Sequence, residues 1–183
     1  MKLNVEQSPI SHAVSVARLP QKGMPVTIDA DEAQRAALAR AHELVSVGSL
    51  RADLLVTSWK RDGIKVSGRL QAQIVQSCIV TLEPIDATVD EEVSALFLPE
   101  GSKLALPDAL ENGEILLDAA GPDSPEIFSG DTIDVGKLAE EFFSLGIDPY
   151  PRKSGASLQA GAEGGEEKRG PLFEKLQALR KKL

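Results

Sequence analysis

The feature that most constrains this sequence is the pair Asp62-Gly63, which joins two segments of alternating apolar and polar residues. Before the pair, the side chains on one side of an extended chain belong to Leu50, Ala52, Leu54, Val56 and Ser58. After it, the same period of two continues through Ile64, Val66, Leu70, Ala72 and Ile74. Asp-Gly is favoured in tight hairpin turns because both central residues need a positive φ. The sequence therefore predicts an antiparallel hairpin over residues 50–78.

Gly68 lies inside the second strand of this hairpin. A glycine there indicates a bulge or a close approach by another backbone, and the sequence leaves both open. Beyond Pro84 the alternation resumes through Ala87, Val89, Val93, Ala95 and Phe97, with an irregularity expected at the adjacent acids Glu91 and Glu92. This pattern predicts a third antiparallel strand, then an exposed excursion over residues 99–113 and a short strand over 114–118.

Two segments have helical spacing. In residues 29–45, Asp29 and Glu32 stand at capping-box spacing, and the expected apolar face comprises Ala33, Ala37, Ala41, Leu44 and Val45. In residues 135–145, Asp134 is the expected N-cap, and Gly146 is expected to end the helix in the left-handed conformation. The apolar stripe of this second helix comprises Val135, Leu138, Phe142 and Leu145.

These elements predict an α+β fold, with a small antiparallel β-sheet or partly closed barrel and two packed helices. The folded domain is expected to span residues 1–152. Residues 153–170 contain too little apolar material to order themselves and predict a flexible tether. Residues 171–183, "PLFEKLQALRKKL", predict a short basic amphipathic helix that docks either on its own domain or on a partner, and the sequence leaves both open. The expected contact residues of this helix are Phe173, Lys175, Leu176, Leu179, Arg180, Lys181 and Lys182.

The charge is unevenly distributed along the chain. The formal net charge is -8, but residues 168–183 carry +5, which leaves -13 for the rest. Such an acidic body repels phosphate, so it is a poor sequence-independent binder of nucleic acid. No signal-peptide core or membrane span is recognisable, so a cytoplasmic protein without membrane contact is expected.

Each residue that could take part in catalysis or binding also has a purely structural interpretation, which is favoured here. Cys78 is the only cysteine, and a nucleophilic role is less favoured than a packed strand residue because no neighbouring cation would lower its pKa. The acids between Glu83 and Glu92 are read as the solvated face of a strand, and His12 and His42 as structural or surface residues. Trp59 is assigned to covering the end of the core rather than to stacking on a nucleobase. No catalytic residue, metal site, cofactor or small-molecule substrate is predicted.

Three segments in order resemble the YceD family, which is associated with accumulation of the large-subunit ribosomal RNA. They are "QAQIVQSCIVTLEPI" at 71–85, "DSPEIF" at 123–128 with "DTIDVGKLAEEFFSLGIDPYPRKSGA" at 131–156, and the terminal "PLFEKLQALRKKL". The family has a Cys-x-x-Cys-Leu-Glu type of segment, whereas Thr81 stands here at the second cysteine position. In this respect the chain resembles the alphaproteobacterial branch, and a metal role for paired cysteines does not carry over.

The resemblance implies a non-catalytic factor that acts on large-subunit ribosomal RNA or on a ribosomal protein. The matched positions expected to form a shared surface are Gln76, Cys78, Thr81, Glu83, Glu141, Asp148, Tyr150 and Arg152. An alternative is a general adaptor that uses its C-terminal helix as a docking peptide. The weakest alternative is an enzyme that uses the carboxylates near residues 83–92. The oligomeric state does not follow from the sequence.

Overall fold

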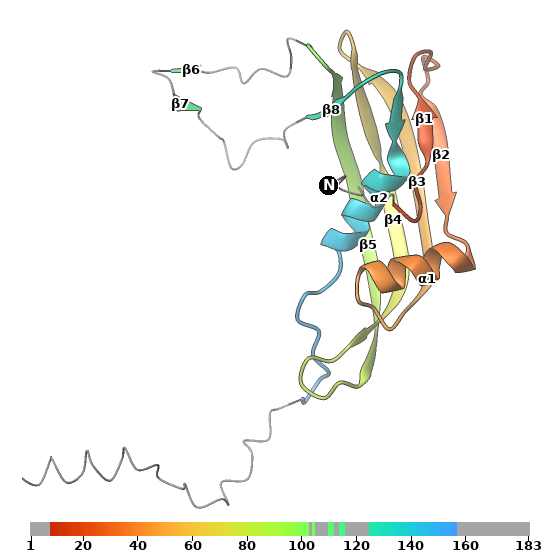
Figure 1. The fold of residues 1–183 in the computed structure, drawn as a ribbon, viewed down its shortest axis with the longest axis vertical. Helices are drawn as coiled ribbons and strands as arrows, with labels where there is room; N and C mark the ends of the chain where they lie inside the picture. Colours follow the sequence, from red (N-terminus) through yellow and green to blue (C-terminus); the bar gives the residue numbers. More distant parts are fainter. Residues whose placement is uncertain (1–7, 103, 105–109, 112–113, 116–124, 157–183) are drawn as a thin grey trace, which may run out of the picture.

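The fold was analysed in a computed structural model, which describes residues 8–102, 104, 110–111, 114–115 and 125–156. Its centre is a five-stranded sheet in the order β2-β3-β4-β5-β8 (Figure 1). The first four strands are antiparallel, and β8 pairs parallel to the end of β5. The strands are β2 (Met24–Asp29), β3 (Ser46–Trp59), β4 (Gly63–Ser77), β5 (Pro84–Pro99) and β8 (Glu126–Phe128).

Two helices and a small second sheet lie against one face of this sheet (Figure 1). Helix α1 (Glu32–Ala41) packs on β3, and helix α2 (Val135–Leu145) packs on β4 and β5. Strand β1 (Ala13–Ser15) pairs antiparallel with β9 (Thr132–Asp134), directly before α2. Two short strands, β6 (Leu110–Glu111) and β7 (Glu114–Ile115), pair only with each other among the described residues. The α+β prediction is confirmed, and the sheet stays open rather than closing into a barrel.

The predicted hairpin is confirmed as β3 and β4, but its turn differs from the expected one. Trp59 pairs with Gly63, so Gly63 begins β4 and the turn consists of residues 60–62. The positive φ belongs to Lys60, at 52°, and not to Asp62 or Gly63. From the turn the pairing runs without a break to Ser49↔Gln73. Its inward side chains form the core between sheet and helices, because alternate residues of a strand face the same side. The buried hydrophobic ones from these two strands are Val47, Leu50, Ala52, Leu54, Val56, Ile64, Val66, Leu70, Ala72 and Ile74. At the turn, the Nζ atom of Lys60 lies 4.2 Å from the centre of the Trp59 ring.

The third strand is confirmed, but the irregularity expected at Glu91 and Glu92 is wrong. The pairing of β4 with β5 runs without a break from Ile64↔Phe97 to Ser77↔Pro84. Glu91 therefore continues the inward series and is only partly buried. The register shift lies instead on β3, between Val47 and Ser49.

Gly68 marks a close backbone approach, not a bulge. A Cβ atom there would overlap the carbonyl oxygen of Asp53 and lie 2.8 Å from the Cα atom of Leu54. Gly68 pairs in regular register with Leu54 and Val93. Of the two alternatives left open by the sequence, the structure selects the close approach.

Helix α1 is shorter than predicted, and its cap is shifted. Asp29 ends β2 opposite Arg51, so it is not available as a cap. The N-cap is Asp31, whose carboxylate accepts the N–H of Gln34 at 2.8 Å, and the Gln34 side chain accepts the N–H of Asp31 in return. The expected apolar face is also wrong, because the buried residues of α1 are Leu38 and Ala39.

Helix α2 has the predicted bounds and the predicted N-cap, Asp134. Two details differ. Gly146 is not left-handed, since its φ and ψ are -79° and -5°. Phe143 takes the buried position that was assigned to Leu145, which is 77% exposed.

The predicted strand at 114–118 is present as β7 at 114–115, and its remainder lies outside the described residues. The predicted helix at 171–183 and most of the tether also lie outside them. Within the described ranges, neither helix is long and apolar enough to cross a membrane.

Candidate functional site

The loop that joins β4 to β5, residues 78–83, is closed by backbone hydrogen bonds. The N–H of Cys78 donates to the carbonyl oxygen of Glu83 at 2.8 Å, and the N–H of Leu82 donates to that of Cys78 at 2.9 Å. Leu82 adopts a φ of +59° to complete the turn. The sequence "CIVTLE" therefore forms a compact loop at one end of the sheet.

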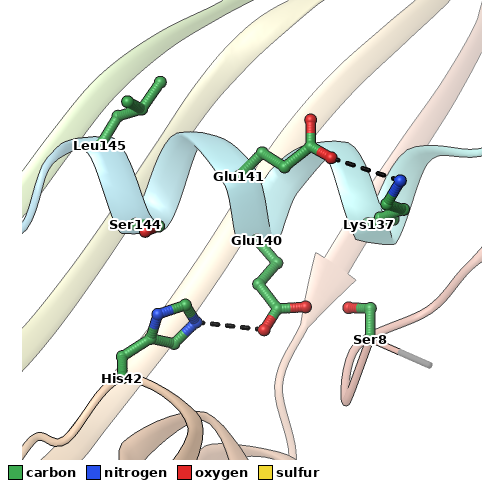
Figure 2. A pocket seen from close by; sticks show the side chains of 7 residues that line it. All are labelled: Ser8, His42, Lys137, Glu140, Glu141, Ser144 and Leu145. Atoms are coloured by element: carbon green, nitrogen blue, oxygen red, sulfur yellow. Dashed lines mark hydrogen bonds and ion pairs between the residues drawn. The ribbon is translucent and has the colours of Figure 1, made fainter. Parts of the chain in front are cut away.

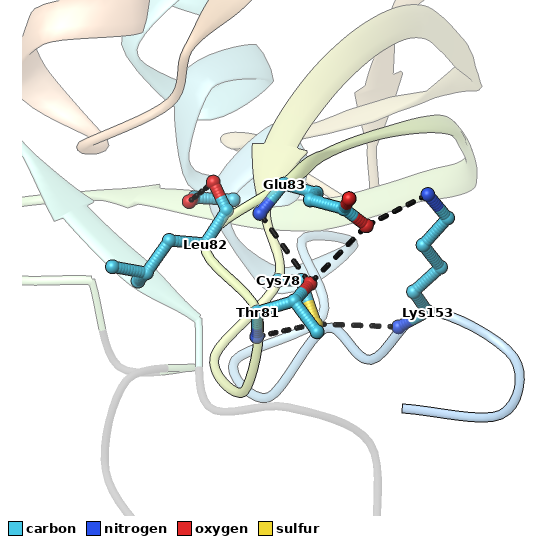
Figure 3. A network of polar contacts seen from close by, with 6 residues as sticks. Cys78, Thr81, Leu82, Glu83 and Lys153 are labelled. Atoms are coloured by element: carbon cyan, nitrogen blue, oxygen red, sulfur yellow. Dashed lines mark hydrogen bonds and ion pairs between the residues drawn. The ribbon is translucent and has the colours of Figure 1, made fainter. Parts of the chain in front are cut away.

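The segment that follows α2 is held against this loop at three places. The Gln76 side chain donates to the carbonyl oxygen of Asp148 at 2.7 Å. The N–H of Ile79 donates to the carbonyl oxygen of Pro151 at 3.0 Å, and the N–H of Lys153 donates to the Cys78 sulfur at 3.4 Å. Residues 76–83 and 148–153 thus form one structure, which we call the loop cluster (Figure 3).

An ion pair links the two halves of the loop cluster. The Nζ atom of Lys153 lies 2.8 Å from a carboxylate oxygen of Glu83 (Figure 3). The hydrogen bond and charge of Lys153 lower the pKa of Glu83, and Glu83 raises the pKa of Lys153 for the same reasons. Both side chains are about half exposed, so water screens the pair and its net contribution to stability is small.

The Cys78 side chain is buried in the centre of the loop cluster. The hydrogen bond of the Thr81 side chain lowers the pKa of the thiol to about 6, together with the backbone N–H groups of Lys153 and Thr81. Cys78 follows the last residue of β4, so it is a packed loop residue rather than the expected strand residue. No cation stands near Cys78 in the sequence, but hydrogen-bond donors from the turn itself and from Lys153, distant in sequence, lower the pKa of the thiol.

The outer surface of the loop cluster carries large exposed side chains. Leu82 is 77% exposed and Tyr150 70%, and Ile79 and Arg152 are also exposed. The cluster therefore combines a hydrogen-bonded interior with apolar and aromatic groups in contact with solvent.

A second region lies on α2, about a hollow of 410 Å³ lined by Ser8, His42, Lys137, Glu140, Glu141, Ser144 and Leu145 (Figure 2). The Nε2 atom of His42 lies 3.1 Å from a carboxylate oxygen of Glu140. The His42 ring also meets Phe143 edge to face, with centroids 5.3 Å apart. These contacts join the end of α1 to α2.

A smaller groove, of about 170 Å³, lies between α2 and β5, and we call it the edge groove. It is lined by Ser94, Ala95, Leu96, Glu126, Leu138, Glu141, Phe142 and Leu145. Burial raises the pKa of Glu126, and the negative charge of Glu141 raises it further. Glu141 and Leu145 line both this groove and the hollow in Figure 2.

The structure brings together most of the surface expected from the sequence. Gln76, Cys78, Thr81, Glu83 and Asp148 meet in the loop cluster, and Tyr150 and Arg152 lie on the same returning segment. Glu141 lies apart on α2, where Lys137 is 3.5 Å away. The expected contacts Phe173, Lys175, Leu176, Leu179, Arg180, Lys181 and Lys182 lie outside the described residues.

Sequence reasoning missed Lys153 and the His42–Glu140 pair. Lys153 directly follows the "DPYPR" segment, which was the one available signal. His42 and Glu140 are 98 positions apart, and no local pattern links them. Within the described part of the chain, no group of three or more His, Cys, Asp or Glu residues is arranged to hold a metal ion.

Comparison with known proteins places these observations in a family. No curated protein and no solved structure matches the chain. A family model described as "Large ribosomal RNA subunit accumulation protein YceD" matches residues 66–180, which is more than half of the sequence. This range contains the loop cluster, the edge groove and α2. The chain therefore belongs to the YceD family, as the order of its three segments predicts.

Proposed function

We propose that this protein is a non-catalytic factor in large-subunit ribosomal RNA accumulation that binds a basic ribosomal protein through its acidic surface. The family description supports the link to ribosomal RNA. In this role the protein works in the cytoplasm on components of the large subunit. The choice of a protein client rests on the charges around α2 and the edge of the sheet.

One observation carries this choice: β5, β8 and α2 together have seven carboxylates and a single lysine, Lys137. The carboxylates are Asp86, Asp90, Glu91, Glu92, Glu126, Glu140 and Glu141. In the described part of the chain, ion pairs within 4.0 Å reach only Asp90, Glu140 and Glu141 of this set. Asp86, Asp90 and Glu92 lie on the outer face of β5, and Glu140 and Glu141 lie on α2 against the other face. This excess of negative charge around the edge of the sheet attracts a basic protein and orients its approach.

The same charges oppose direct RNA binding by this surface, because phosphates and carboxylates repel one another. We assign any contact with RNA, or with a second protein, to the basic residues of 171–183. The exposed Leu82, Tyr150 and Arg152 of the loop cluster give a further contact surface at the opposite end of the β4–β5 pair.

The chemistry of the candidate groups supports a non-catalytic role. The Cys78 sulfur is buried, so a substrate cannot reach it without opening the loop. Asp90 borders a hollow of about 350 Å³ with Gly68, Arg69 and Glu92. Arg69 donates to Asp90 at 2.5 and 2.6 Å, and this hydrogen bonding lowers the pKa of Asp90. Asp90 is therefore a stable ion-pair partner rather than a proton donor near neutral pH.

The test is to recover the tagged full-length protein from growing cells and to measure both ribosomal RNAs after its depletion. We expect large-subunit ribosomal proteins in the recovered material and a selective loss of the larger RNA. A double variant, Asp86→Asn with Glu92→Gln, should lose the ribosomal proteins, because both side chains are exposed on β5. The matched control is Glu32→Gln with Glu43→Gln, which makes the same charge change on and beside α1. Equal recovery by both double variants would contradict the proposal.

A further inference from the structure

Strand β5 has an open edge over most of its length. On one side it pairs with β4 along its whole length, but on the other side β8 pairs only with Phe97, Leu98 and Pro99. Among the described residues, no strand pairs with this side of residues 84–96. Backbone N–H and C=O groups directed to this side are therefore available to an additional strand.

The edge groove lies along this open edge. Three consecutive residues of β5 line it, namely Ser94, Ala95 and Leu96. Successive side chains of a strand point to opposite faces of the sheet, so a groove that contacts all three meets the strand from its edge. Its other wall is α2, which contributes Leu138, Glu141, Phe142 and Leu145.

We propose that the edge groove binds an extended basic segment of the ribosomal client, which adds to β5 as a further strand beside α2. This inference rests on the proposed function and names the form in which the client binds. Backbone hydrogen bonds to β5 supply affinity, and alternate side chains of the added strand supply specificity.

The surroundings of the groove define the side chains of the occupant. Side chains of the added strand that point towards α2 contact Leu138, Phe142 and the exposed Leu145. This apolar wall favours valine, leucine or the methylene stem of arginine at those positions. Side chains directed to the outer face meet Asp90 and Glu92, which suit lysine or arginine. The expected occupant alternates apolar and basic residues.

The carboxylates also select against other strands. An apolar strand would have to approach Asp86 and Glu92 without neutralising them, and charges on an edge strand oppose such pairing. At the groove itself, burial raises the pKa of Glu126, and the negative charge of Glu141 raises it further. A cation from the occupant would relieve this repulsion, so a basic strand binds where an apolar one does not.

The test uses the full-length protein and a synthetic octapeptide that alternates arginine and valine. Two further peptides carry N-methyl groups on either the arginines or the valines. An N-methyl group removes a backbone donor, and only one of the two sets of N–H groups faces β5. We expect one methylated peptide to lose affinity by at least about ten-fold and the other to bind about as well as the parent. Equal binding by both, or no binding by the parent peptide, would overturn the proposal.

Two substitutions locate the binding on the protein. Glu141→Gln should weaken binding of the peptide about two- to five-fold at low salt, as expected for a partly screened ion pair. Leu145→Ser should weaken it as well, without loss of stability, because Leu145 is largely exposed. The matched controls are Glu32→Gln and Val45→Ser, which change an exposed acid and an exposed apolar residue away from the groove. If the controls weaken binding as much, the site is elsewhere.

Hydrogen exchange of the free protein distinguishes the other occupants. We expect amides on the open side of residues 84–96 to exchange rapidly and to become protected by the peptide. Protection without peptide that grows with protein concentration would assign the edge to a second copy. Protection that disappears after Lys175→Glu and Arg180→Glu would assign it to residues 171–183. Either result overturns binding of an external strand.

The two proposals fail in different ways. Equal recovery of ribosomal proteins from cells by Glu141→Gln, Leu145→Ser and the unmodified protein would contradict binding of the client in the edge groove. That result would leave the proposed function intact. If the peptide binds as predicted but no ribosomal protein is recovered from cells, strand binding at β5 is supported and the ribosomal identity of the client is contradicted.

Discussion

The backbone N–H of Lys153 donates to the sulfur of Cys78 at 3.4 Å, although the two residues are 75 positions apart. This contact fixes the chain that leaves α2 against the loop between β4 and β5. It also places a hydrogen-bond donor on a buried thiol, which favours the thiolate. The stability of the loop cluster should therefore depend on the ionisation of Cys78.

The first prediction concerns the pH dependence of this contribution. The thiol pKa is about 6 in the folded protein, below its ordinary value of 9.0. A lowered pKa means that the thiolate contributes stability that is fully present above pH 9 and is lost as the pH falls towards 6. The difference in the free energy of unfolding between the unmodified protein and Cys78→Ala should therefore grow from pH 6 to pH 9. Urea unfolding at several pH values measures it.

Ile79→Ala is the control for this experiment, because it alters the same loop without removing a titratable group. Its difference from the unmodified protein should stay constant over the same range. A pH-independent effect of Cys78→Ala would show that the thiol stays protonated. Alkylation should also be slow in the folded protein despite the low pKa, because the sulfur is buried.

The second prediction concerns Gly146, at the end of α2. Its backbone is in the ordinary right-handed region, but a Cβ atom would lie 2.5 Å from a methyl carbon of Val89 and 2.9 Å from the Cγ atom of Glu91. Gly146→Ala and Gly146→Asn should each lower the free energy of unfolding by about 1–3 kcal/mol, as overpacking does. A left-handed glycine would instead tolerate asparagine.

A double-mutant cycle identifies the cause of this loss. Val89→Ala removes the methyl group that a new Cβ atom at position 146 would meet. In that background Gly146→Ala should cost less than it does alone, and chemical denaturation measures the difference. Additive effects of the two substitutions would contradict a direct steric contact.

The hairpin and α2 could be predicted because their signals are local. Two runs of alternating residues around a turn, and an N-cap before an apolar stripe, each lie within one short window of sequence. The Asp-Gly pair located the turn for the wrong reason, since the positive φ belongs to Lys60. The cap of α1 could not be predicted this way, because Asp29 and Asp31 are both suitable residues. Only the pairing of Asp29 with Arg51 across the sheet decides between them.

The site was predictable in part for the same reason. The motif residues near Cys78 were recognisable as a segment, but the contact with Lys153 depends on how α2 directs the chain back to the loop. The open edge of β5 is likewise a property of strand order, which alternation does not encode. Gly146 shows the limit most clearly, since a correct helix end was predicted for the wrong physical reason.

The third prediction concerns Leu82, whose φ of +59° is unfavourable for a side chain with a Cβ atom. Asparagine tolerates this conformation better, and little apolar contact is lost because Leu82 is mostly exposed. Leu82→Asn should raise the free energy of unfolding by about 0.5–1 kcal/mol. The control Val45→Asn changes another exposed apolar residue without a positive φ and should give no gain. A loss of stability in Leu82→Asn would mean that the leucine side chain makes a stabilising contact.

The fourth prediction concerns Asp134, which connects the N-terminal segment to α2. Its carboxylate accepts the Ser11 hydroxyl at 2.6 Å and the N–H groups of His12, Gly136 and Lys137 at 2.8–3.0 Å. Partial burial raises its pKa, but these hydrogen bonds outweigh the burial and leave the pKa below its ordinary value.

Asp134→Ala should therefore cost about 2–4 kcal/mol, because it removes a helix cap together with hydrogen bonds to a charged group. Asp134→Asn should cost less, since its side-chain oxygen still accepts the backbone N–H groups of α2. Asp131→Ala, on the preceding exposed turn, should change the free energy of unfolding by less than about 0.5 kcal/mol. Because the folded pKa of Asp134 is lowered, its contribution is present above its ordinary pKa and is lost as the pH falls through the lower folded value. The cost of Asp134→Ala, measured by urea unfolding, should accordingly shrink in acid, and a cost that stays constant there would mean that Asp134 stabilises the fold without its charge.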